Sequence, residues 1–100
     1  MDNLSLMTDE EILSILCAKA KALRLQKNRR QSDLAKKSGL SLPTISAFEK
    51  TGLISFANLL KISRALGTIE TLSALFPPLP VIDIEQLISD QKKPRKRVRR

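Results

Sequence analysis

The side chains in this sequence that could do chemistry are mainly cationic groups and small hydroxyl groups. The chain of 100 residues carries 18 Lys and Arg against 10 Asp and Glu, and it contains no His. Its one cysteine, Cys17, stands in an apolar helical pattern without a base to activate it. The sequence also has no Gly-rich phosphate loop and no clustered carboxylates. These observations argue against an enzyme, and nothing in the sequence calls for a cofactor or a metal ion.

The positive charge is concentrated in two parts of the chain. Residues 1–18 have four acids and no Lys or Arg, which gives a net charge of −4. Residues 19–67 have eleven Lys and Arg against two acids, which gives a net charge of +9. Residues 68–91 have four acids and a net charge of −4, and residues 92–100 have seven Lys and Arg and a net charge of +7. A basic middle and a basic tail suit a polyanionic partner, because each neutralised phosphate releases condensed counterions.

Five helices are expected to position these side chains. Leu, Ile and Ala dominate the apolar residues, and Trp and Tyr are absent, which favours helices over strands. Thr8 followed by Glu11 matches a capping box for a first helix that runs to about Asn28. Further helices are predicted over 31–38, from the cap Ser41 to Gly52, over 56–66, and as a short fifth over 69–76. The sequence therefore predicts an all-α core.

The stretch RRQSDLAKKSGLSLPTISAFEKTG, residues 29–52, reads as two short helices joined through Gly39. Small inward residues such as Ala35 permit close approach, so this pair predicts a helix-turn-helix. With Leu23 and Arg24 before it and LLKISRALG after it, the stretch resembles the Xre family of Cro/lambda-repressor-like DNA-binding proteins. The resemblance covers residues 16–76 and implies a five-helix lambda-repressor-like domain that binds double-stranded DNA.

The resemblance also implies a set of DNA-binding positions. In the family, the position of Gln31 meets the DNA backbone, and the exposed positions of the third helix enter the major groove. The family also pairs the positions of Arg24 and Glu49, a structural salt bridge that ties the first helix to the third. The residues carried over as DNA-binding are Arg30, Gln31, Ser41, Leu42, Pro43, Thr44, Ser46, Ala47 and Lys50.

Two features depart from the family pattern. Arg29 and Arg30 stand where the family commonly has an apolar residue and then a Ser, Thr or Asn cap. The recognition positions also lack Arg, Asn and Gln, the side chains that read purine edges bidentately. Discrimination between DNA sequences would then depend on thymine methyl contacts, single hydrogen bonds and DNA shape. The residues available for the direct contacts are Leu42, Pro43, Thr44, Ser46 and Ala47.

Within this family the chain is most similar to HipB-type antitoxins. The similarity is clearest around LAKKSGLSLPTISAFEK, which a short helical region, a Pro-rich linker and a basic tail follow. It implies a homodimeric repressor that binds the palindromic operator of its own operon and sequesters a HipA-like Ser/Thr kinase toxin. A stand-alone phage-type or housekeeping repressor would share every one of these motifs. A protein-interaction module that does not bind DNA is the competing class.

The two ends of the chain carry weaker patterns. Residues 1–15 are expected to form an extension leading into the first helix, and 16–76 the helix-turn-helix DNA-binding domain. Residues 77–90 are expected to form a Pro-rich linker and a short apolar element, VIDIEQLIS, which suits either a strand or a helix. Residues 91–100 are expected to be a disordered basic tail that either solubilises the chain or binds DNA or a partner.

The first helix has more apolar residues than one face requires. Ile12, Leu13, Ile15 and Leu16 span more than one face, so a dimer contact or the N-terminal extension could use the excess. The chain has neither a signal-peptide pattern nor an apolar run of about 20 residues that could span a membrane. With a single cysteine, these features predict a cytoplasmic, nucleoid-associated protein without membrane contact.

Overall fold

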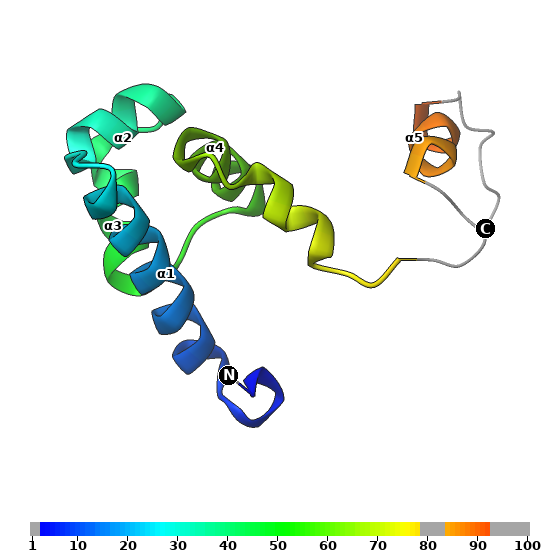
Figure 1. Cartoon of the computed structure of the whole chain (residues 1–100), viewed down its shortest axis with the longest axis horizontal. Helices are drawn as coiled ribbons and strands as arrows, with labels where there is room; N and C mark the ends of the chain where they lie inside the picture. The colour runs from blue at the N-terminus through cyan, green and yellow to red at the C-terminus, as the bar shows by residue number, and fades with distance from the viewer. Residues whose placement is uncertain (1–2, 79–83, 93–100) are drawn as a thin grey trace, which may run out of the picture.

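The computed structural model describes residues 3–78 and 84–92. Within these ranges every regular element is helical (Figure 1), which confirms the predicted all-α fold class. Two of the elements are 3-10 helices, written η. In chain order the elements are η1 (Leu4–Leu6), α1 (Asp9–Gln26), α2 (Gln31–Ser38), α3 (Leu42–Thr51), α4 (Phe56–Leu66), η2 (Ile69–Ala74) and α5 (Ile84–Lys92).

The ends of α1 follow the signals in the sequence. The Thr8 hydroxyl accepts a hydrogen bond from the backbone N–H of Glu11 at 3.1 Å. The Glu11 carboxylate accepts one from the N–H of Thr8 at 2.9 Å, which completes the predicted capping box. The helix ends at Gln26, and Asn28 takes a left-handed conformation with a φ of 56°. This turn leads the chain into α2.

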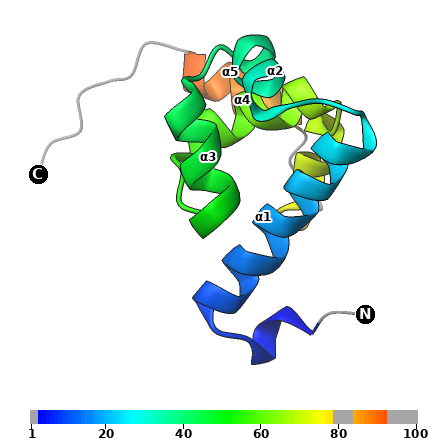
Figure 2. The ribbon, with the colours of Figure 1, turned by 90° about the vertical axis from the view of Figure 1, so that its left-hand side faces the viewer.

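A glycine and a serine set the turn between α2 and α3. Gly39 ends α2 with a φ of 79°, a conformation that costs glycine little. Ser41 then caps α3, because its hydroxyl accepts the backbone N–H of Thr44 at 3.2 Å. Figure 2 shows α3 on the left of the helical body, with α1 to its right.

At the beginning of α2, Asp33 binds the backbone of the N-cap residue Arg30, whose own side chain makes no capping hydrogen bond. The Asp33 carboxylate accepts the backbone N–H of Arg30 at 2.8 Å. A carboxylate in the first turn is also favoured by the helix dipole. The sequence contains this signal, since Asp33 follows Arg30 by three residues, as the acid of a capping box does.

The predicted short fifth helix is present as the 3-10 helix η2, which ends at Ala74. The backbone N–H of Thr71 donates to the Thr68 carbonyl at 3.0 Å. The hydroxyls of Thr71 and Ser73 also donate to carbonyls three residues earlier in the chain. Hydroxyl donors of this kind compete with α-helical bonding, which explains the tighter helix.

The apolar element near the C-terminus forms a helix and not a strand over the residues that the structure describes. α5 covers Ile84–Lys92, while Val81 and Ile82 lie outside the described residues. Gln91 and Lys92 belong to α5, so the expectation that disorder begins at residue 91 is wrong for these two residues. Gln and Lys both have favourable helix propensities, which accounts for the extension. The expected disorder of 93–100 falls outside the described residues.

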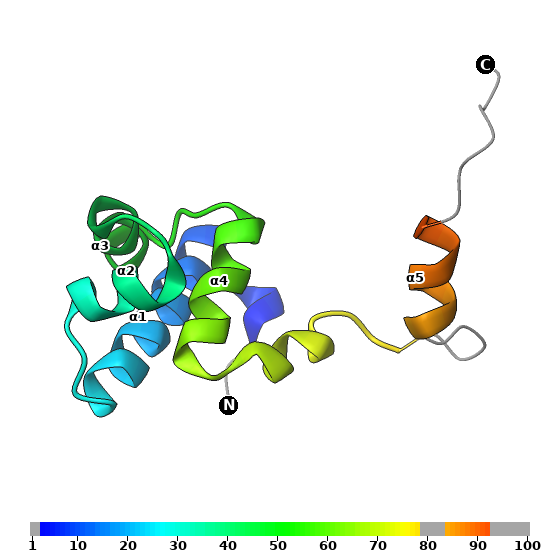
Figure 3. The same cartoon turned by 90° about the horizontal axis from the view of Figure 1, so that it is seen from above.

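The core lies among the first four α-helices. α1 packs against α3, and α2 packs against both α3 and α4. Leu34, Ile45 and Ile62 are the largest fully buried side chains, and Cys17 is buried among them as a core residue. Seen from above, α1 to α4 form one body, and η2 leads from it towards α5, which lies apart (Figure 3). The body holds α2 and α3 in a fixed relation.

Candidate nucleic-acid interface

An ion pair beneath α3 joins it to α1. The Nε of Arg24 donates to Oε2 of Glu49 at 2.7 Å, and Nη2 donates to Oε1 at 3.0 Å. This arrangement is bidentate, and the two side chains are only 7% and 4% exposed. The remaining guanidinium nitrogen, Nη1, donates to the carbonyl of Arg29 at 2.7 Å. The pair that the family resemblance implies is therefore present, and it fixes α3 against α1.

Gln31 brings α2 to the same carboxylate. Its Nε2 donates to Oε1 of Glu49 at 2.9 Å, so side chains from three helices meet at this point. Burial by itself raises the pKa of Glu49, but the hydrogen bonds from Arg24 and Gln31 and the charges of Arg24 and Lys21 outweigh burial. The pKa of Glu49 is consequently held below its ordinary value of 4.5. The resemblance assigns Gln31 to the DNA backbone, and the structure gives its half-buried side chain this second partner.

Arg29 belongs to the scaffold. Its Nη1 donates to the carbonyl of Ala65 in the last turn of α4 at 3.2 Å, and its side chain is half-buried. A cation at the C-terminal end of a helix is favoured by the helix dipole. Arg29 belongs to the basic middle of the chain, and this hydrogen bond turns its guanidinium towards α4. The neighbouring Arg30 is exposed.

The outward face of α3 is exposed along its whole length. Ile45 and Phe48, on the inward face, are buried with 0% and 5% exposure. The helical spacing thus separates a core face from a solvent face. The carried-over residues on the outward face are Leu42, Pro43, Ser46, Ala47 and Lys50, and all of them are exposed.

Ser41 and Thr44 are partly committed to the beginning of α3. Their hydroxyl oxygens lie 2.7 Å apart, in addition to the cap that Ser41 provides for the N–H of Thr44. Thr44 is half-buried, whereas Ser46 is exposed. Thr44 and Ser46 were both carried over as exposed positions of the third helix. Ser46 is exposed as expected, whereas Thr44 is only half-exposed, and its hydroxyl lies against that of the cap Ser41.

Exposed cations lie on both helices of the α2–α3 pair. Arg30 lies at the beginning of α2, Lys36 and Lys37 lie in its last turn, and Lys50 lies in the last turn of α3. Side chains of this kind bind phosphate oxygens and set the position of a protein on a duplex. The α2–α3 pair therefore combines exposed small side chains with positive charge on both of its helices.

The described part of the chain has neither a cluster of metal-ligating side chains nor a membrane-spanning helix. Over residues 3–78 and 84–92, no group of three or more His, Cys, Asp and Glu is placed to hold a metal ion. Over the same residues, no helix has the length and apolar character needed to cross a membrane. The described residues can bind a partner through charge contacts, hydrogen bonds and apolar contacts.

Comparison with family models matches residues 21–72 to the family described as Helix-turn-helix. The matched segment begins within α1 and ends within η2, so it contains α2, α3 and the Arg24–Glu49 pair. Comparison with curated proteins gives no significant match. Because the matched segment is more than half of the chain, and because α2 and α3 have the geometry described above, the chain belongs to the Xre-like helix-turn-helix family of DNA-binding regulators.

Proposed function

We propose that this chain is a sequence-specific transcriptional repressor that inserts the outward face of α3 into the major groove. The observation that carries the proposal is the division of α3 into two faces. Its inward residues are buried or bonded to α1 and α2, while Ser46, Ala47 and Lys50 are exposed. A helix held in this way can present small side chains to base edges without rearrangement of the domain.

The proposed contacts fall into two groups. Arg30, Lys36, Lys37 and Lys50 contact phosphates and position the domain, which gives affinity without sequence preference. Ser46 and Ala47, with Leu42 and Pro43 at the beginning of α3, meet the base edges. Because none of these four side chains can form a bidentate hydrogen bond to a purine, DNA shape supplies a large share of the specificity.

The repressor is proposed to act as a homodimer on a palindromic operator. One helix-turn-helix of this size makes few base contacts, so useful specificity requires two copies with their α3 helices one DNA turn, about 34–36 Å, apart. The repressor is proposed to act in the cytoplasm, at the nucleoid. A basic tail on each copy adds phosphate contacts outside the groove.

The biological setting that we propose is a toxin–antitoxin operon. The order of helix-turn-helix, Pro-rich linker and basic tail supports an antitoxin that sequesters a HipA-like Ser/Thr kinase. The runner-up is a stand-alone phage-type or housekeeping repressor with the same DNA-binding domain. Purification of the tagged chain from its own host, with sequencing of bound DNA and mass spectrometry of bound proteins, separates the two. A co-purifying kinase supports the antitoxin, and recovered DNA without a kinase supports the stand-alone repressor.

A salt titration tests the DNA-binding part of the proposal. Affinity of the full chain for a random duplex should fall steeply with salt, with a slope of about −0.9 per phosphate neutralised. Affinity for the DNA recovered with the chain should exceed that for the random duplex at every salt concentration. A protein-interaction module would show no useful binding to either duplex, and that result would overturn the proposal.

A further inference from the structure

The turn from α1 to α2 leads into the end of α2 that is expected to meet the DNA backbone. Arg30, proposed above as a phosphate contact, is the N-cap residue of α2. Gln31, which the family resemblance assigns to the DNA backbone, is the first residue of the helix. Arg29 precedes both and is half-buried, whereas the exposed residues of the turn are Lys27, Asn28 and Arg30. Arg29 is therefore the residue through which this turn reaches the body of the domain.

Arg29 is bonded to α1 through its backbone and to α4 through its side chain. Its N–H donates to the carbonyl of Arg24 at 3.2 Å, and its own carbonyl accepts Nη1 of Arg24 at 2.7 Å. Its Nη1 donates to the carbonyl of Ala65 at 3.2 Å. Since Arg24 also pairs with Glu49 of α3, the side chain of Arg29 extends the network that joins α1 and α3 as far as α4.

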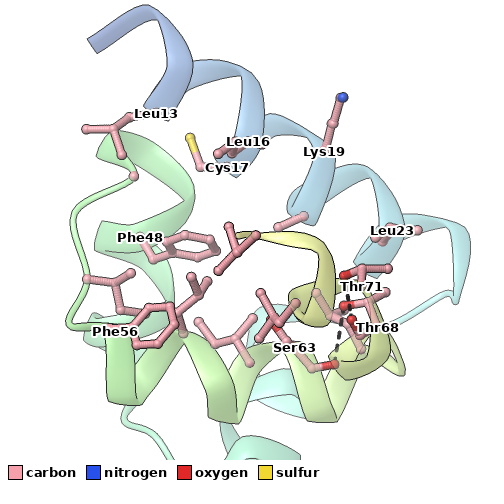
Figure 4. A pocket seen from close by; sticks show the side chains of 18 residues that line it. Leu13, Leu16, Cys17, Lys19, Leu23, Phe48, Phe56, Ser63, Thr68 and Thr71 are labelled. Carbon is pink, nitrogen blue, oxygen red and sulfur yellow. Dashed lines mark hydrogen bonds between the residues drawn. The ribbon is translucent and has the colours of Figure 1, made fainter. Parts of the chain in front are cut away.

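The end of α4 has a carbonyl available for this guanidinium, because the last four carbonyls of an α-helix have no donor within the helix. Thr68 donates its N–H and its hydroxyl to the carbonyl of Ser63, at 2.8 and 3.3 Å. Figure 4 shows this bond beside an open apolar groove of about 520 Å³ between α1, α4 and η2. Arg29 supplies a donor for Ala65, which is 6% exposed. Loss of the guanidinium would take this donor from a buried carbonyl.

Hydrogen bonds hold the beginning of α2, whereas apolar packing holds its middle. Leu34 and Ala35, in the middle of the helix, are buried with 1% and 8% exposure. At the beginning, Arg30 is exposed, and Gln31 is half-buried with its Nε2 bonded to Glu49. A binding group must be held within about 0.5 Å of its working position. The bond made by the residue before Arg30 and Gln31 therefore bears directly on their contacts with phosphate.

We propose that Arg29 is a positioning residue for DNA binding. By joining the α1–α2 turn to the end of α4, its side chain holds Arg30 and Gln31 where they meet the phosphate backbone, and it does not contact DNA itself. The inference rests on the DNA binding proposed above, and it names a residue outside α2 and α3 on which that binding depends. Loss of the Arg29 side chain should then remove phosphate contacts while every group that makes such a contact is still present.

Salt titration of full-length variants on a random duplex tests this role. Arg29→Met keeps an unbranched apolar side chain and removes the donors. It should lower affinity about tenfold to a hundredfold and reduce the salt slope by about 1, because the phosphate contact of Arg30 is lost. Arg29→Lys should bind nearly as the parent does, since its ammonium group can donate to the same carbonyl. Arg64→Met is the matched control: it removes an exposed cation from the last turn of α4 and should leave both quantities nearly unchanged.

A double-mutant cycle separates positioning from direct contact with DNA. If Arg29 acts through Arg30, the double variant Arg29→Met with Arg30→Ala should bind about as weakly as Arg29→Met alone, because the contact of Arg30 is already lost. If Arg29 binds a phosphate itself, the two losses of binding free energy add. Additive losses would therefore overturn the inference.

Circular dichroism at the temperature of the titrations establishes whether each variant is folded. A folded Arg29→Met with the affinity and salt slope of the parent would overturn the inference, and so would Arg64→Met with the same losses as Arg29→Met. An Arg29→Met chain that does not fold would assign Arg29 to the stability of the whole domain and would overturn it as well. In all three cases a parent that binds DNA keeps the proposed function. A parent that binds neither the random duplex nor the recovered DNA would overturn both.

Discussion

The inward and outward faces of α3 differ in how their side chains are held. On the inward face, Ile45 and Phe48 are buried, and Glu49 accepts hydrogen bonds from two other helices. On the outward face, Ser46, Ala47 and Lys50 are exposed. Changes on the inward face are therefore expected to act on folding, and changes on the outward face on the binding of DNA.

The largest effect on folding is expected from loss of the buried ion pair. Glu49→Ala or Arg24→Ala should lower the free energy of unfolding by about 3–5 kcal/mol, because each leaves its partner charged and buried. Urea denaturation of the full chain measures the change. Glu70→Ala, which removes an exposed glutamate of η2, should change stability by less than about 0.5 kcal/mol. Overlapping curves for Glu49→Ala and the parent would contradict the account.

The end of α3 offers a second test, with a matched pair of glycines. Gly52 and Gly39 have φ of 81° and 79°, so alanine at either costs about 1–2 kcal/mol in backbone strain. A Cβ at Gly52 would lie 2.9 Å from Cβ of Leu13, whereas one at Gly39 would meet nothing within 4 Å. Gly52→Ala should therefore cost about 1–3 kcal/mol more than Gly39→Ala. Equal losses of stability in thermal or urea denaturation would show that the end of α3 at Gly52 is not in close contact with Leu13 of α1.

The pH dependence of stability reports on the same inward face with a smaller effect. Since the pKa of Glu49 is lower in the folded chain than its ordinary 4.5, the unfolded chain takes up this proton first as pH falls. The stabilisation is fully present above pH 4.5 and is lost as pH falls through the lowered pKa. Urea denaturation across this range should show a steeper acid loss for the parent than for Glu49→Gln. Parallel losses would assign the acid sensitivity to other carboxyl groups.

The smallest predicted effect belongs to a single phosphate contact on the outward face. Lys50→Ala should leave stability within about 0.5 kcal/mol of the parent and reduce the salt slope of DNA binding by about 1. Lys61→Ala, at an exposed lysine of α4, provides the matched control and should leave the slope unchanged. The same loss of slope in both variants would mean that positive charge acts on DNA without a defined position.

Local signals made most helix ends predictable. Thr8 with Glu11 and Ser41 cap their helices as expected, Ser55 caps α4, and Gly39 ends α2 in the left-handed conformation. Such signals act within three or four residues, so the sequence contains them in full. η2 was harder to predict, because its hydroxyl bonds to the backbone, which favour a 3-10 helix, compete with a helical apolar spacing.

Contacts between distant segments could be predicted only in part. The family resemblance supplied the Arg24–Glu49 pair, but the bond from Gln31 to Glu49 and the bond from Arg29 to Ala65 join residues 18 and 36 positions apart. Their formation depends on how α2 and α4 pack, which periodicity does not determine. The groove beside α1 is unpredictable for the same reason, although the apolar excess at Leu13 and Leu16 was visible in the sequence.

The central claim is that DNA meets the outward face of α3, and a pair of alanines tests it most directly. Ala47 on α3 and Ala18 on α1 are both exposed within helices, so aspartate at either adds the same charge at a similar cost in helix propensity. Affinity for the DNA recovered with the parent chain would be measured for both full-length variants, with circular dichroism and melting as controls. We predict that Ala47→Asp lowers affinity roughly a hundredfold by placing a negative charge against DNA, and that Ala18→Asp binds nearly as the parent does. Parent-like binding by a folded Ala47→Asp, or equal losses in both variants, would contradict the account.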